Sequence, residues 1–195
     1  MPGTYTVALT AGGRTLDTKT MRVIMDPAVQ LADASRRRYD ALVTDLHDIQ
    51  RLGASAAAAL NALLPQITAA AAKIKDASNV PANVKTQFEA FGKDFDSLRV
   101  KFGVGAAAAA GRGGGGGGGR GGDPDNVLAR TATLKGGIMG IWEPPSDASV
   151  RQSADAKLAL QRAISDANAF LAKATAMGQT LKPYDIMLTV PGAVK

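Results

Sequence analysis

The sequence feature that most constrains the fold is an apolar stripe near the middle of the chain. Its members recur in alternating steps of four and three residues: Val84, Phe88, Phe91, Phe95, Leu98 and Phe102. This spacing places all six side chains on one face of an α-helix, as in the seam between two packed helices. A cofactor site would need polar groups converging on the same stripe, and the sequence suggests none. We therefore interpret this phenylalanine seam as part of a helical core.

A second helical stripe precedes the seam, in a segment that begins at about Ala28. Gly53 and Pro65 interrupt it, and Pro65 is expected to kink or split the helix. A turn at residues 78–81 separates the two segments, so antiparallel packing of the seam on this stripe is expected, with Leu42, Leu46, Ile49 and Leu60 as partners. The members of the stripe are Leu42, Leu46, Ile49, Leu52, Ala56, Leu60, Leu63, Ile67, Ala71 and Ile74.

Two more helices are predicted in the C-terminal part of the chain. The third runs from about Pro124, well placed in a first helical turn, to Ile141. The fourth begins with Ser146 or Asp147 as its cap and continues to about Met177. Their stripes are Val127, Thr131, Leu134, Ile138 and Ile141, and Leu160, Ile164, Ala167, Leu171 and Ala174.

The N-terminus has the pattern of a β-hairpin. Residues 4–10 alternate between apolar and polar side chains, which is typical of a half-buried strand. The dipeptide Gly12-Gly13 is a strong turn signal, and a second strand is expected from about Thr15 to Met25. The apolar phase of that strand shifts after Leu16, which predicts a bulge. Two strands alone are marginal in water, so the open face with Tyr5, Val7 and Leu9 is expected to need a neighbour.

A low-complexity stretch lies between the second and third helices. It includes an unbroken run from Gly113 to Gly119, for which we expect a flexible loop. An RNA-binding reading would rest on Arg112 and Arg120, but such segments usually repeat the motif with aromatic residues between. A phosphate-binding glycine loop is disfavoured too, since no lysine followed by Ser or Thr comes after it.

Charge and composition favour neither nucleic acid nor membrane as a partner. The formal net charge is +6, but it is spread along the chain, and the only adjacent basic residues are Arg36, Arg37 and Arg38. No run approaches the roughly 18 apolar residues of a membrane span, and no signal peptide is visible. The chain has no cysteine, which excludes disulfides, thiolate metal sites and a cysteine nucleophile.

No catalytic, cofactor-binding or metal-binding residue is predicted. His47 is the only histidine, and it lies one position off the apolar stripe with no nucleophile motif nearby. Asp45 and Asp48 face roughly the same way, and paired carboxylates can hydrolyse glycosides. On a charged helix they are more often simply solvated. The same holds for the arginine cluster at residues 36–38, which we expect to form a mixed-charge surface.

These patterns predict a mainly-α fold: an up-down antiparallel bundle of about four helices with an N-terminal β-hairpin. The expected division is residues 1–27 for the hairpin, 28–102 for helices one and two, 103–123 for the Gly-rich loop, 124–180 for helices three and four, and 181–195 for an extended tail.

The N-terminal stretch PGTYTVALTAGGRTLDTKTMRVIMDP resembles the closing hairpin of an immunoglobulin-like domain near the C-terminus of large bacterial propeller proteins. These proteins carry sortilin-type and BNR-type repeats and are commonly labelled glycosyl hydrolases. The later stretch LKGGIMGIWEPPSDAS is similar to their helical tail. The Gly-rich stretch departs from the family pattern in the length of one connection.

The resemblance implies that the hairpin is the remnant of a truncated β-sandwich. It further implies that the chain is a non-catalytic module of an exported protein, periplasmic or extracellular, which packs against upstream propeller domains or another protein. Any catalytic residues of the family would lie on the propellers. The alternative is a free-standing helical adaptor that dimerises through its apolar seams, and an oligomer is possible in either case.

Overall fold

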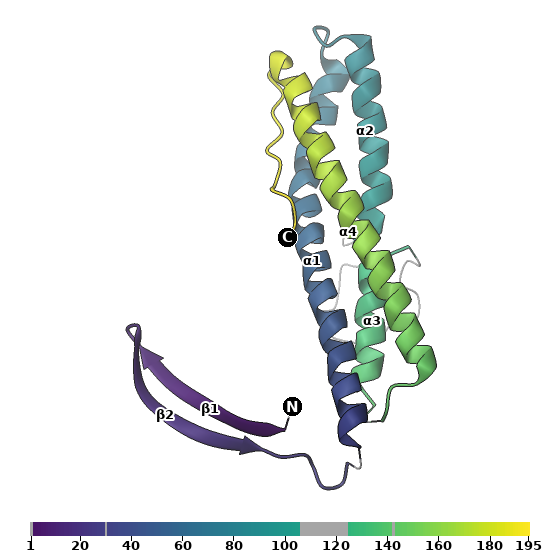
Figure 1. Cartoon of the computed structure of the whole chain (residues 1–195). Helices are drawn as coiled ribbons and strands as arrows, with labels where there is room; N and C mark the ends of the chain where they lie inside the picture. The colour runs from purple at the N-terminus through teal and green to yellow at the C-terminus, as the bar shows by residue number, and fades with distance from the viewer. Residues whose placement is uncertain (1, 30, 106–124, 142) are drawn as a thin grey trace, which may run out of the picture.

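The computed structural model describes residues 2–29, 31–105, 125–141 and 143–195 (Figure 1). This part of the chain forms a mainly-α fold with four α-helices and an N-terminal antiparallel hairpin, as expected. In chain order the elements are β1 (Gly3–Ala11), β2 (Arg14–Val23), α1 (Asp33–Asp76), α2 (Ala82–Val100), α3 (Val127–Met139), α4 (Asp147–Leu181) and the short 3-10 helix η2 (Lys182–Tyr184).

The four helices form three columns rather than four (Figure 1). Helices α1 and α4 run side by side in the same direction, and Arg38 near the start of α1 forms an ion pair of 3.4 Å with Asp147, the first residue of α4. Helices α2 and α3 lie end to end and run the opposite way. At their junction the backbone N–H of Leu128 donates to the carbonyl of Lys101 at 3.4 Å. The third column therefore consists of two helices, α2 and α3, that follow one another in the same direction.

The phenylalanine seam forms the centre of the upper part of the bundle, as predicted. All six of its members are buried, and their main aromatic partner is Phe170 on α4. The ring of Phe91 stacks on Phe170 with centroids 4.8 Å apart, and that of Phe95 lies 5.5 Å away. Such aromatic contacts add about 0.5–1.5 kcal/mol each beyond the burial of apolar area.

The seam packs at a different level of α1 than the sequence suggested. A Cβ placed on Gly53 would lie 2.9 Å from a methyl carbon of Leu128, so this level of α1 already faces the start of α3. Of the four expected partners, Leu42, Leu46 and Ile49 precede Gly53, and only Leu60 follows it. A Cβ on Gly105, just after the seam, would lie 3.5 Å from Cδ2 of Leu64, so the seam faces the C-terminal half of α1. One member of the α1 stripe also differs, because Ala70 is buried in place of the exposed Ala71, while Ile67 and Ile74 are buried as predicted.

Helix α1 continues through Pro65, so the predicted split is wrong. A proline inside a helix removes one backbone hydrogen bond and costs about 3 kcal/mol. Pro65 lies on the exposed side of α1, while Leu60, Leu63 and Ile67 on either side of it are almost fully buried. Packing of the flanking turns therefore outweighs the local cost.

Helix α1 has the length and composition of a membrane-crossing helix. One 18-residue window reaches a mean hydropathy of 1.2, with 33% of the window buried in the bundle. Residues 52–72 carry no charged side chain. Scattered polar residues interrupt this segment, so it does not stand out as a continuous run of apolar residues in the sequence. Core helices pass the same test, and nine positions of α1 line the core. The expected absence of a membrane span stays a prediction.

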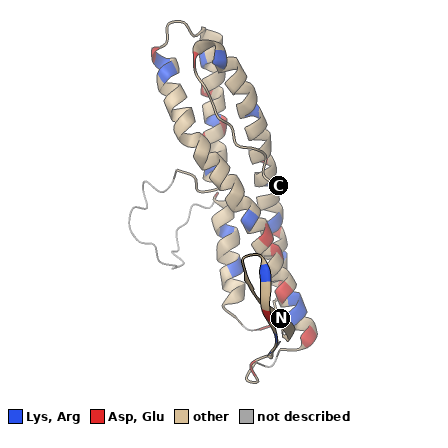
Figure 2. Ribbon diagram, turned by 90° about the vertical axis from the view of Figure 1, so that its left-hand side faces the viewer, with Lys and Arg blue, Asp and Glu red and all other residues tan. Residues whose placement is uncertain are grey.

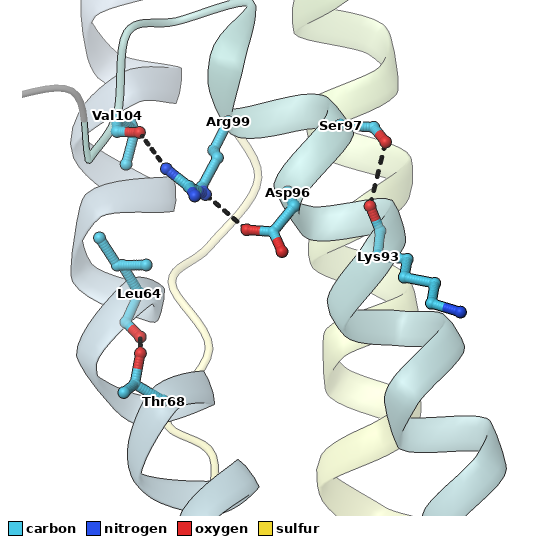
Figure 3. A network of polar contacts seen from close by, with 7 residues as sticks. All are labelled: Leu64, Thr68, Lys93, Asp96, Ser97, Arg99 and Val104. Atoms are coloured by element: carbon cyan, nitrogen blue, oxygen red, sulfur yellow. Dashed lines mark hydrogen bonds and ion pairs between the residues drawn. The ribbon is translucent and has the colours of Figure 1, made fainter.

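The end of α2 is a packed turn, which corrects the expected start of the Gly-rich loop at residue 103. The N–H of Val104 donates to the carbonyl of Arg99, and that of Gly103 to Val100, which together form a Schellman motif. Arg99 braces the turn, because its guanidinium donates to Asp96 at 2.6 Å and to the carbonyl of Val104 at 3.0 Å (Figure 3). The remainder of the predicted loop, residues 106–123, lies outside the described residues.

Side-chain caps fix the starts of α3 and α4. Asn126 accepts a hydrogen bond from the N–H of Ala129 at 2.9 Å, so α3 begins after Asn126. Pro124, near which the helix was expected to begin, lies outside the described residues. Of the two caps considered for α4, Ser146 is the one used, accepting from the N–H of Ser149 at 3.1 Å. An N-terminal cap of this kind is worth about 1 kcal/mol.

Candidate protein-interaction surface

The N-terminal hairpin folds as its sequence predicts. Strands β1 and β2 pair antiparallel around Gly12 and Gly13, whose φ angles of 57° and 76° are those of a type I′ turn. Leu9 pairs with Asp17 and Thr10 with Thr15, which leaves Leu16 as the extra residue of a bulge. This bulge explains the phase shift seen in the sequence, since the apolar residues of β2 change sides at Leu16.

The two faces of the hairpin differ sharply in character. Directly paired residues share a face, so Tyr5 lies beside Met21, and Val7 beside Lys19. The opposite face is rich in threonine, with Thr6 paired to Thr20. We define the open face by its apolar members: Tyr5, Val7, Leu9, Met21 and Val23.

The open face is exposed to solvent along its whole length. Its side chains are between 37% and 62% exposed, with Val23 and Leu9 at the two extremes. The hairpin points away from the helices and does not lie against them (Figure 1). Of the eleven large apolar side chains that are exposed in the described part of the chain, seven lie within residues 5–24. Apolar residues clustered in this way are typical of interaction sites.

The polar residues considered as catalytic candidates do not converge. His47 and Asp48 are exposed on α1. The carboxylate of Asp45 is held by the ammonium group of Lys157 on α4, at 2.6 Å, which makes it part of an ion pair between helices. No group of three metal-ligating side chains is found within residues 2–29, 31–105, 125–141 and 143–195.

The arginine cluster is largely neutralised by neighbouring carboxylates. Arg36 pairs with Asp33 at 3.0 Å, and Arg38 with Asp147, while Arg37 is exposed. Basic and acidic residues alternate along the bundle in Figure 2, without a continuous basic stripe in that view. The cluster thus has the mixed-charge surroundings that its sequence suggested.

Two surface hollows lie along α3 and α4, and each is bordered by one carboxylate. The first, about 560 Å³, is bordered by Lys101, Arg130, Arg162 and Asp125 at the α2–α3 junction. The second, about 500 Å³, lies at the corner between α3 and α4 and is mainly apolar, with Glu143 as its one carboxylate. Glycoside hydrolysis uses a pair of carboxylates, and each of these borders supplies one.

Comparisons with known proteins give no match. No family model matches the chain, and neither a curated protein nor a solved structure matches it. The open face is therefore the feature on which a functional argument rests.

Proposed function

We propose that this chain is a non-catalytic interaction module, the helical C-terminal part of an exported propeller protein of the sortilin type. Its hairpin supplies the last two strands of an immunoglobulin-like β-sandwich. The observation that carries the proposal is the open face, an apolar sheet surface on which none of the described helices packs. Because the N-terminal sequence resembles such a closing hairpin, the partner we propose is the rest of that β-sandwich, upstream in the same protein.

The chemistry of the open face fits another β-sheet. Sandwich sheets pack through rows of alternating apolar side chains, and β1 and β2 present such rows on one side and threonines on the other. The five side chains of the open face are about half exposed. Covering them recovers about 1 kcal/mol each, or about 5 kcal/mol in total.

The alternative, an adaptor that dimerises through its seams, has less support. The phenylalanine seam and the buried stripe of α1 are used within a single chain. Dimerisation through the open face alone is also disfavoured by area. A two-stranded face about 30 Å long offers roughly 300 Å², which is about half of the 600 Å² per partner in the smallest stable interfaces. A larger sheet of an upstream domain would bury more area, because it would cover the open face and also pair with an edge of the hairpin.

The gene upstream of the Met1 codon provides the first test. We expect the reading frame to continue through the other strands of a sandwich and through propeller repeats. An in-frame stop codon directly before Met1, preceded by a ribosome-binding site, would contradict the proposal and favour the free-standing adaptor.

A binding experiment provides the second test. The upstream domain, produced separately, is expected to bind this chain, and Val7→Glu with Leu9→Lys on the open face should abolish binding. The matched control is Thr6→Glu with Thr10→Lys on the threonine face, which should retain it. Equal loss in both variants would show that the open face is not the contact surface.

A further inference from the structure

The C-terminal tail packs against both α1 and α4, through Gln66 on α1 and through Asn168 and Gly178 on α4. We call the strip of surface that it covers the groove. After η2 the chain turns at Asp185, whose φ is 57°, and residues 186–195 run back along the bundle (Figures 1 and 2). Ile186 is only 4% exposed and belongs to the core. Residues 186–195 are extended, as expected, but the extended part begins later than residue 181, because α4 continues to Leu181 and residues 182–184 form η2. The extended part is also docked on the bundle.

Two side-chain amides hold the backbone of the tail. On α1, Gln66 donates from Nε2 to the carbonyl of Thr189 at 3.0 Å and accepts from the N–H of Thr189 at 2.7 Å. On α4, Asn168 does the same for Val194, donating at 3.1 Å and accepting at 2.8 Å. Each amide therefore satisfies both backbone groups of one tail residue, in the way that a neighbouring strand would.

The tail side chains alternate between the groove and solvent. Ile186, Leu188 and Val190 pack towards the core, while Met187 is 79% exposed. On the α4 side, a Cβ at Gly178 would lie 3.6 Å from the Cβ of Leu188, which is ordinary contact distance. Backbone hydrogen bonds combined with pockets for alternate side chains are the means by which proteins bind extended peptides.

We propose that the groove between α1 and α4 is a binding site for an extended peptide with aliphatic residues at alternate positions. Residues 186–194 of the same chain occupy it, and the ligand it takes in trans is the same tail from a second copy. An attached ligand has a high effective concentration, on the order of millimolar, so it excludes a free peptide until it is displaced. This site is distinct from the open face and does not depend on the function proposed above.

The test uses the full-length chain with a weakened tail. Ile186→Asp together with Leu188→Asp removes two apolar anchors and leaves every groove residue in place. A fluorescent peptide of residues 185–195 with the natural sequence is then titrated against this variant and against the wild type, with anisotropy as the readout. We expect saturable binding to the variant and at least tenfold weaker binding to the wild type, whose own tail fills the groove.

The amides supply the specific control. Adding Gln66→Ala and Asn168→Ala to the weakened-tail chain should reduce peptide affinity at least tenfold, while adding Gln152→Ala, an exposed amide on α4 outside the groove, should not. Circular dichroism reports whether each variant keeps its helices. No saturable binding to a folded weakened-tail chain, or equal binding with and without the two amides, overturns the proposal.

A second measurement needs no change in the tail. In the full-length chain, Gln66→Ala should speed amide hydrogen exchange at Thr189 at least tenfold and affect Val194 less, and Asn168→Ala should do the reverse. Unchanged exchange at both amides in both variants would show that the side-chain amides do not hold the tail.

Discussion

At the residue scale, one glycine determines how α2 ends and how α3 begins. Gly103 has a φ of 67°, a conformation that costs other L-residues about 1–2 kcal/mol. A Cβ there would lie 2.5 Å from Nδ2 of Asn126, the residue that caps α3. Both effects act at the junction between α2 and α3. The turn at Gly103 is therefore part of the packed structure and not the start of an irregular loop.

Gly103→Ala is therefore expected to lower the free energy of unfolding by about 2–3 kcal/mol, from backbone strain together with loss of the cap. The matched control is Gly92→Ala in the middle of α2, where a Cβ would have no neighbour within 4 Å. That change should stabilise the chain by up to about 1 kcal/mol through helix propensity. Urea unfolding followed by circular dichroism measures both, and equal midpoints for the two variants would contradict this account.

A further residue-scale prediction concerns catalysis. We expect no glycosidase activity from the purified chain, because the carboxylate of Asp45 is held by Lys157 and Asp48 is exposed on the same helix. Hydrolysis of an aryl glycoside is the assay. Turnover that survives repurification and is lost on Asp45→Asn or Asp48→Asn would disprove the prediction.

Residue patterns revealed the apolar members of the open face but not the groove. Tyr5, Val7 and Leu9 follow a period of two that is visible in the sequence. Gln66 and Asn168, by contrast, are ordinary amides on helices, and their role depends on a tail that meets them only after the chain has folded. No local pattern carries that information.

At the element scale, the hairpin is a complete amphipathic sheet without a covering layer. Val7 lies opposite Lys19, and Leu9 lies opposite Asp17. These pairings allow the open face to be made polar while the hairpin is retained. Val7→Glu and Leu9→Lys each create a cross-strand pair of opposite charges, and together they leave the net charge unchanged.

This double variant should be less prone to self-association at high concentration, because exposed apolar strands with unpaired edges promote aggregation. Its thermal unfolding midpoint should hardly change, since the hairpin does not pack on the bundle. Light scattering and circular dichroism measure the two properties. Thr6→Glu with Thr10→Lys is the control, and an equal fall in association for both variants would rule out the open face as the cause.

The elements also show where local signals are reliable and where packing overrides them. The double glycine of the hairpin, and a cap at either Ser146 or Asp147, were predictable because their geometry depends on neighbouring residues only. Of the two outcomes expected at Pro65, a kink or a split, the split does not occur, because the cost of about 3 kcal/mol is local whereas the apolar residues around it are buried in the core.

At the scale of the whole molecule, end-to-end stacking of α2 and α3 determines which residues meet. Helical periodicity identified most members of the seams, although Ile141 of the predicted third stripe is exposed and the buried Phe170 was not among the predicted members of the fourth. It gives no information on the level at which one helix faces another. The three-column arrangement follows from helix lengths, because the 44 residues of α1 and the 35 of α4 are longer than either α2 or α3. The bundle buries its seams within one chain, whereas the hairpin buries almost nothing.

This contrast predicts a wide range of local stability. A two-stranded hairpin is marginal in water, so its amides should exchange hydrogen through local opening. Amides near Phe91 and Phe95 lie in the aromatic centre of the bundle and should exchange only on global unfolding, which costs about 5–15 kcal/mol in typical domains. Protection should therefore differ by at least about a thousandfold between the two regions. Hydrogen exchange followed by NMR or mass spectrometry tests this.

If hairpin amides exchanged as slowly as those of α2, the strands would be docked on the bundle or on a second copy. The open face would then already be covered, and it would not be available to a partner sheet.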